Sequence, residues 1–149
     1  MSQGSLFGPA GGGSAVANID GGSRGNPGPA GYGVRIEQQD GAIVELKASM
    51  AIATNNVAEY NGLLAALRWA LANGVATLHI RSDSELLVKQ MNGQYRVKNP
   101  GLQPLYEEAR TLVKQIGRVK FEHVRREFNK EADRLANEAM DEAAAGSSL

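Results

Sequence analysis

The chain has 149 residues, a formal net charge of zero and no cysteine. This length suits one domain with a single hydrophobic core, and the lack of cysteine excludes disulfides, thiolate zinc sites and a cysteine nucleophile. No apolar run is long enough to cross a membrane, and the N-terminus lacks the basic segment and apolar run of a secretory signal. We therefore expect a cytoplasmic protein without a membrane partner.

The zero net charge conceals a basic segment. Residues 86–130 contain ten Lys or Arg and four Asp or Glu. A basic stretch is typical of proteins that bind nucleic acids, but charge clusters are also common on solvated faces that bind nothing. The charge pattern alone leaves both interpretations open.

The first half of the chain predicts a leader followed by three strands. Residues 1–14 are rich in Gly and Ser without an apolar period, so we expect a disordered leader. A β-prone run over residues 15–20 predicts a strand that ends on Asp20, before the loop GGSRGNPGPAG. Alternating apolar residues over 32–36 and 44–50, with an Asp-Gly pair between them, predict an antiparallel meander.

The second half alternates between helices and strands. The apolar period is helical for residues 60–71, 85–91, 102–116 and 132–139, and strand-like for residues 77–82 and 119–123. The strand over 77–82 ends at Asp83, and the tail over 143–149 is expected to be disordered. This order predicts an α/β domain over residues 15–142, a five-stranded mixed sheet of antiparallel meander plus parallel strands, with helices on both faces.

Four acids stand where a side chain can enter a site. Asp20 and Asp83 each end a predicted strand, and Glu59 and Asp133 lie near helix N-termini beside apolar faces. Each acid alone also fits a local role, as a turn residue or as a first-turn acid favoured by the helix dipole. If the four meet, they repel one another without cations, and such oxygen ligands suit Mg²⁺ or Mn²⁺ rather than zinc.

The runs that carry these acids resemble type 1 ribonuclease H, in the order and at the spacing of that family. They are IDGGSRGNPGPAGYG (residues 19–33), TNNVAEYNGLLAAL (54–67), IRSDSELLVKQMNG (80–93) and NKEADRLANEA (129–139). A glycine-rich loop alone would be a weak signal, but each of the four runs places one acid where the family uses one. The resemblance covers about residues 15–141 and implies the ribonuclease H-like fold.

The resemblance implies an endonuclease that cuts the RNA strand of an RNA–DNA hybrid and leaves 5′-phosphate and 3′-hydroxyl ends. It implies two Mg²⁺ ions, with Mn²⁺ as a substitute, held by the four acids as catalytic and metal-binding residues. By this match Asp20 would bridge both ions. Glu59 and Asp83 would complete the shell of one ion, and Asp133 would serve the other.

The resemblance also implies contacts with the hybrid, which proteins recognise chiefly through the minor groove and the 2′-hydroxyl. The implied contacts are Gly21, Gly22, Asn26, Thr54, Asn55, Asn56, Lys98, Asn99 and Arg126. From the residues alone, Asn26 is equally a turn residue and residues 54–56 are equally a helix cap. Both kinds of role can hold at once. Three of these contacts, Lys98, Asn99 and Arg126, lie in the basic segment, so binding of the hybrid would explain its charge.

Two features of many bacterial relatives are missing. Only the short link GQYRVKNPG stands in place of their basic protrusion, so we expect weaker hybrid affinity. Their loop histidine before the last acid is also missing, because the short loop VRREFNK offers only Arg126 or Glu127 as a replacement. His79 and His123 fall in predicted strands, and we expect them to pack or pair structurally.

Other functions stay open at this point. A hybrid- or duplex-binding module could keep the fold without turnover, although four intact acids argue against it. The same fold also serves resolvases, transposases and exonucleases, and some relatives cut double-stranded RNA, whereas the tract over residues 54–56 favours the hybrid. We expect a monomer, because no interface motif is visible.

Overall fold

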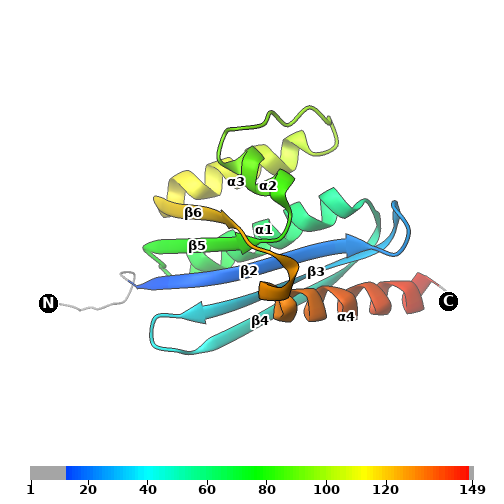
Figure 1. The fold of residues 1–149 in the computed structure, drawn as a ribbon, viewed down its shortest axis with the longest axis horizontal. Coiled ribbons are helices and arrows are strands. Elements are labelled where there is room, and N and C mark those ends of the chain that lie inside the picture. Colours follow the sequence, from blue (N-terminus) through cyan, green and yellow to red (C-terminus); the bar gives the residue numbers. More distant parts are fainter. Residues whose placement is uncertain (1–12, 148–149) are drawn as a thin grey trace, which may run out of the picture.

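A computed structural model of the protein describes residues 13–147. Its centre is a five-stranded mixed sheet in the order β4-β3-β2-β5-β6 (Figure 1). The strands are β2 (Ser14–Ser23), β3 (Gly28–Gln38), β4 (Ile43–Ala53), β5 (Thr77–Ser82) and β6 (Arg118–His123). β2, β3 and β4 pair antiparallel, whereas β5 pairs parallel with both β2 and β6. The predicted α/β class and mixed sheet are confirmed.

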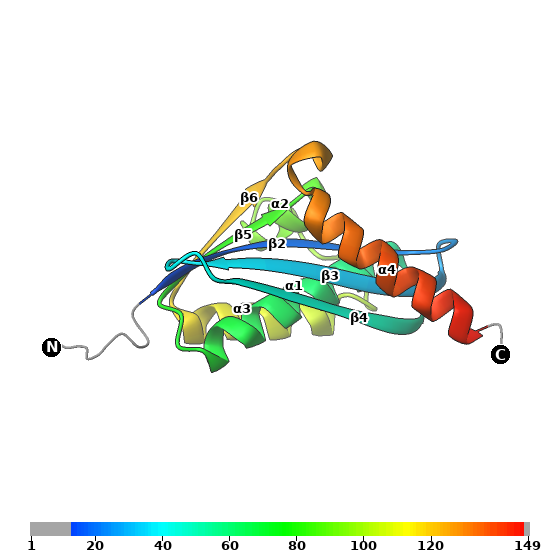
Figure 2. The same cartoon turned by 90° about the horizontal axis from the view of Figure 1, so that it is seen from below.

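Helices cover both faces of this sheet, as predicted. α1 (Asn55–Ala72) and α3 (Gln103–Ile116) lie on one face, and α4 (Lys130–Ser147) crosses the other face over β3 and β4 (Figure 2). The short α2 (Glu85–Met91) follows β5, and one 3-10 turn, η1 (Arg126–Phe128), precedes α4. Within residues 13–147, we find no helix that combines the length and the apolar character of a membrane span.

Alternation along β2 separates the two faces. Ala15, Ala17 and Ile19 are buried in the core between the sheet and α1, where the leucines of α1 cover them. Because successive strand residues point to opposite faces, Asn18 and Asp20 lie on the side of α4. Asn18 and Asp20 therefore face the N-terminal end of α4.

Glycines let α4 come very close to β3. A Cβ added to Gly33 would lie 2.5 Å from Cβ of Leu135, and one added to Gly31 would lie 2.6 Å from Cβ of Ala139. Both separations are shorter than any real side chain tolerates, so a larger residue would push the helix outward. The two glycines thus set the depth at which α4 lies on the sheet.

Two predicted boundaries are wrong. β2 does not end on Asp20 but runs on to Ser23, because residues 20–23 keep pairing with β3 after the pairing with β5 has stopped. Residues 143–147 are not a disordered tail but the last turn of α4, in keeping with the high helix propensity of its alanines. Of the predicted leader, residues 1–12 lie outside the described residues, and Ser14 already belongs to β2.

We expect Gly33→Ala to lower the free energy of unfolding by about 1–3 kcal/mol, the usual cost of overpacking. Gly146→Ala on α4 is the matched control, since a Cβ there meets nothing within 4 Å. It should leave stability unchanged or raise it slightly, because alanine favours a helix over glycine. Urea unfolding followed by circular dichroism measures both, and a Gly33→Ala midpoint equal to that of the wild type would contradict the close approach.

Candidate active site

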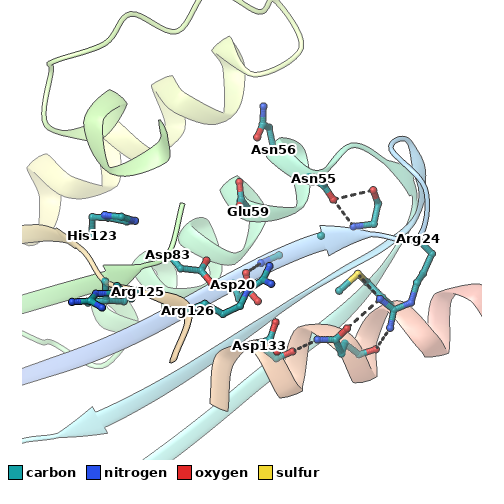
Figure 3. A pocket seen from close by; sticks show the side chains of 16 residues that line it. Asp20, Arg24, Asn55, Asn56, Glu59, Asp83, His123, Arg125, Arg126 and Asp133 are labelled. Atoms are coloured by element: carbon teal, nitrogen blue, oxygen red, sulfur yellow. Dashed lines mark hydrogen bonds between the residues drawn. The ribbon is translucent and has the colours of Figure 1, made fainter. Parts of the chain in front are cut away.

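A polar cavity of about 520 Å³ opens where β2, β5 and the N-termini of α1 and α4 converge (Figure 3). All four acids singled out in the sequence line it, namely Asp20, Glu59, Asp83 and Asp133. The fold therefore brings together carboxylates from four separate elements.

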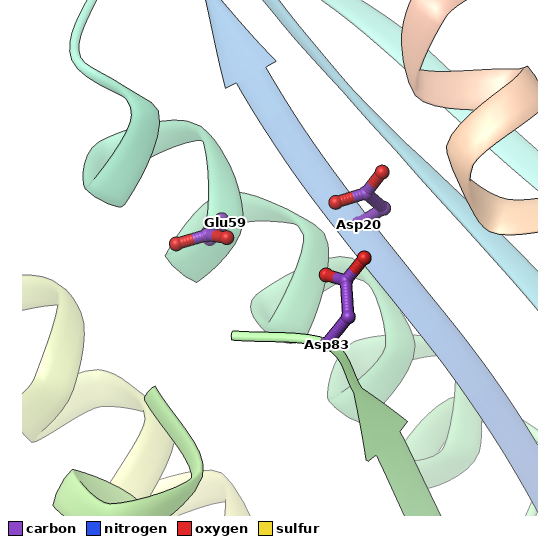
Figure 4. Close-up of side chains that lie close together, drawn as sticks. All are labelled: Asp20, Glu59 and Asp83. Atoms are coloured by element: carbon purple, nitrogen blue, oxygen red, sulfur yellow. The ribbon is translucent and has the colours of Figure 1, made fainter. Parts of the chain in front are cut away.

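Three of the carboxylates form a tight group. Asp20, Glu59 and Asp83 each offer an oxygen, and these oxygens lie within 4.8 Å of one another (Figure 4). The parallel register of β2 and β5 explains why Asp20 and Asp83 are neighbours. The pairing ends with Ile19 opposite Ser82, and the next residue along the chain in each case is an aspartate at the same edge of the sheet.

Glu59 joins the group because α1 lies against β2 without a side chain between them. A Cβ on Gly21 would be 2.5 Å from the carbonyl carbon of Ala58 and 2.6 Å from the amide nitrogen of Glu59. The helix begins at a fixed point, since Oγ1 of Thr54 accepts a hydrogen bond from the amide of Val57 at 3.2 Å. Gly21 therefore has a packing role, in addition to lining the cavity.

Asp133 approaches the group from α4, where its carboxyl interacts with that of Asp20. Asn129 holds this end of the helix in place and is only 1% exposed. Its Nδ2 donates to the carbonyl of Ile19 at 2.9 Å, and its own carbonyl accepts from the amide of Asp133 at 3.0 Å. Its Oδ1 accepts from Nδ2 of Asn18 at 2.9 Å. The sequence showed Asn129 only as the first letter of a motif, because nothing in its spacing reveals a buried link to β2.

Burial and mutual repulsion raise the pKa values of Asp20, Glu59 and Asp83. The pKa of Asp20 rises to about 8, mainly through burial and then through the charge of Asp83. Burial raises the pKa of Glu59 to about 7. Burial also raises the pKa of Asp83, and the nearby guanidinium of Arg126 opposes that rise. A group of acids that is costly to ionise is stabilised by a cation, and a donor set made only of carboxylate oxygens fits a hard divalent ion.

The predicted substrate residues separate into two groups. Gly21, Gly22, Asn55, Asn56 and Arg126 line the cavity together with the acids. Asn26 does not line it, but its Oδ1 accepts a hydrogen bond from the amide of Asn55 at 3.0 Å. Thr54 caps α1, so the helix-cap role is confirmed. Lys98 and Asn99 are exposed on the loop between α2 and α3 and lie outside the cavity lining. The binding roles of all these residues stay predictions.

Several other residues line the cavity that the sequence had not singled out for the site: Ser23, Arg24, His123, Val124, Arg125, Asn137 and Met140. Of the two histidines expected to pack or pair structurally, His123 is exposed at the cavity and so does not pack in the core. His123 ends β6 opposite Ser82, the last residue of β5, so it lies at the same edge of the sheet as Asp83. His79 lies away from the cavity, with Nε2 2.8 Å from Oε1 of Glu122 but without the geometry of a hydrogen bond. Glu127, one candidate replacement for the loop histidine, lines a different pocket.

Comparison with known proteins agrees with this arrangement. The family described as "Reverse transcriptase-like" matches residues 18–139. Ribonuclease HI of Halobacterium salinarum is 43% identical over 133 residues, which cover 89% of this chain and 67% of that protein. The "Bifunctional protein Rv2228c" of Mycobacterium tuberculosis is 50% identical over 131 residues, which cover 87% of this chain. The match spans only 36% of the length of that relative.

Solved structures are similar over nearly the whole fold. The N-terminal RNase H domain of the Mycobacterium tuberculosis protein has a TM-score of 0.86 and 47% identity, covering 90% of this chain and 98% of that one. LC11-RNase H1, solved in complex with an RNA/DNA hybrid, has a TM-score of 0.82 and 40% identity, covering 87% and 99%. On its sequence, its fold and the convergence of its four acids, the chain belongs to the type 1 ribonuclease H family.

Proposed function

We propose that this chain hydrolyses the RNA strand of RNA–DNA hybrids, using Mg²⁺ held by its four cavity carboxylates. The observation that carries the proposal is the approach of the Asp20, Glu59 and Asp83 oxygens to within 4.8 Å in an open polar cavity. The relatives support the choice of reaction and substrate, since one is a ribonuclease HI and another was solved with an RNA/DNA hybrid.

The residues present fit magnesium better than other common metals. Every candidate ligand is a carboxylate, and no cysteine exists in the chain to favour a softer metal. Asp20, Glu59, Asp83 and Asp133 would hold two ions between them. When bound, such ions activate the attacking water and neutralise the phosphate at the cleaved bond. Mn²⁺ takes similar ligands and is the expected substitute.

Four other cavity residues bind and orient the nucleic acid. Arg125 and Arg126 bring positive charge beside the acids, which attracts the phosphate backbone. The side chains of Asn55 and Asn56 can both donate and accept hydrogen bonds, as recognition of a 2′-hydroxyl requires. The exposed Lys98 and Asn99 would extend this surface along the DNA strand.

The monomeric state and the cytoplasmic location stay predictions.

Arg126 is the better candidate for the place of the loop histidine, because it faces Asp83 whereas Glu127 does not line the cavity. An arginine cannot release its proton at neutral pH, so it cannot replace a histidine in proton transfer. We therefore assign Arg126 the stabilisation of negative charge on the phosphate beside Asp83.

Asp83→Asn should reduce metal-dependent cleavage of a hybrid by at least about 100-fold, since removing one preorganised charged group costs about that factor or more. The assay compares labelled RNA–DNA hybrid, RNA duplex and DNA duplex with Mg²⁺, Mn²⁺ or a chelator. Asp40→Asn in the β3–β4 hairpin is the matched control and should cleave at the wild-type rate. Hybrid binding without metal-dependent cleavage by the wild type would leave only a binding module.

Without metal, stability should fall as the pH rises from about 4 to about 8. The folded pKa values of Asp20 and Glu59, about 8 and about 7, exceed the ordinary values of 3.8 and 4.5. The unfolded chain therefore loses these protons first, and the folded state is penalised until it loses them too. Mg²⁺ favours the ionised acids, so the rise in Tm that it produces should be larger at pH 8 than at pH 5.

Thermal unfolding with and without Mg²⁺ measures this dependence on pH. Asp20→Asn combined with Glu59→Gln is the control, because it removes both titrations. That variant should show a flatter pH profile and a smaller response to Mg²⁺. A wild-type Tm that rises steadily from pH 5 to pH 8 without metal would contradict the raised pKa values.

Arg126→Ala should lower kcat by about tenfold, as expected when about 1.4 kcal/mol of charge stabilisation is lost from the transition state. Arg126→Lys keeps the charge and should recover part of the loss. Steady-state cleavage at saturating hybrid and Mg²⁺ measures both variants. Unchanged turnover of Arg126→Ala would remove Arg126 from the reaction.

A further inference from the structure

Arg24 lies in the glycine-rich loop between β2 and β3, and its guanidinium points to α4 (Figure 3). Nε and Nη2 donate to Oδ1 of Asp141 at 3.2 and 2.7 Å, and Nη1 donates to Oδ1 of Asn137 at 3.1 Å. All three guanidinium nitrogens thus have partners on one helix. Arginine suits such a link because its donors lie in one rigid plane.

The contact with Asn137 continues to the turn of α4 that carries an active-site acid. Nδ2 of Asn137 donates to the backbone carbonyl of Asp133 at 2.8 Å, while its Oδ1 accepts from Arg24. The amide of Asn137 is therefore engaged at both ends. Through it, the guanidinium of Arg24 is connected to the backbone from which the Asp133 side chain extends.

The other side of the same loop is bound to α1. The amide of Ser23 donates to Oδ1 of Asn55 at 2.8 Å. In return, the amide of Asn55 donates to Oδ1 of Asn26 at 3.0 Å. The loop that carries the predicted groove contact Asn26 thus bridges the two helices that supply Glu59 and Asp133.

We propose that Arg24 is a positioning residue, which fixes the glycine-rich loop against α4 so that the groove contacts and Asp133 keep one relative position. The proposal rests on the function proposed above. Its main rival is direct contact of Arg24 with a phosphate, since Arg24 also lines the cavity. A change at Asp141 distinguishes the positioning role from direct phosphate contact. Asp141 binds the guanidinium but does not line the cavity, and 70% of its side chain is exposed.

The test compares Arg24→Ala, Asp141→Asn and the double variant in steady-state cleavage of a hybrid. Both single changes should raise KM by about tenfold, equivalent to about 1.4 kcal/mol, and lower kcat less. The double variant should be no worse than Arg24→Ala alone, because Asp141 acts on the loop only through the guanidinium of Arg24. Arg24→Lys should recover part of the loss. Lys47→Ala is the matched control, since it removes ion pairs between β4 and α4 away from the cavity.

Direct phosphate contact gives a different pattern. Asp141→Asn would then free the guanidinium and leave KM unchanged or lower it, while Arg24→Ala would still raise it. That pattern overturns the positioning role. A rise in KM for Lys47→Ala equal to that of Arg24→Ala would also overturn it, because any loosening of α4 would then suffice.

A measurement without substrate separates this proposal from the proposed function. The amide of Ser23 bonds to Asn55, and the amide of Arg24 donates to the carbonyl of Pro29 at 2.8 Å. Hydrogen exchange of both amides should be faster in Arg24→Ala and Asp141→Asn than in Lys47→Ala. Unchanged exchange overturns the positioning role. Faster exchange in a protein whose wild type cleaves no hybrid overturns the proposed function alone.

Discussion

The parallel pairing of β2 with β5 is the constraint on which the site depends. Its register ends with Ile19 opposite Ser82, so Asp20 and Asp83 leave the same edge of the sheet as neighbours. Burial makes it costly to ionise Asp20, and the neighbouring charge of Asp83 adds repulsion, so the pKa of Asp20 is raised. Hydrophobic packing between the sheet and α1 holds the two strands in this register, and so offsets the local repulsion.

Close backbone packing then brings two helices to this strand pair. α1 lies against β2 at Gly21, and α4 lies against β3 at Gly31 and Gly33. At each point the missing side chain lets a helix approach more closely than a larger residue would allow. Glu59 and Asp133 reach Asp20 and Asp83 because their helices lie so close to the sheet. These three glycines therefore determine the geometry of the site, although Gly21 alone among them lines the cavity.

A second layer of polar contacts orients the groups that the packing has brought near. Buried Asn129 joins β2 to the start of α4, and the exposed Arg24 joins the glycine-rich loop to a later turn of the same helix. Both contacts bridge segments that are far apart along the chain. α4 is thus fixed at two points along its length, and Asp133 lies between them.

The order of the elements, the α/β class and the identity of the four acids could all be predicted from the sequence. These rest on local patterns, namely apolar periods, turn residues and motifs in which each acid sits beside its own strand or helix. The sequence did not predict that β2 continues past Asp20 or that α4 extends to Ser147, and the meeting of the acids is visible only in the folded chain. The same holds for the position of His123 at the cavity and for the contacts of Arg24 and Asn129 with α4. Such contacts depend on the pairing register and packing distance of segments that are far apart in the chain, and no local period encodes these.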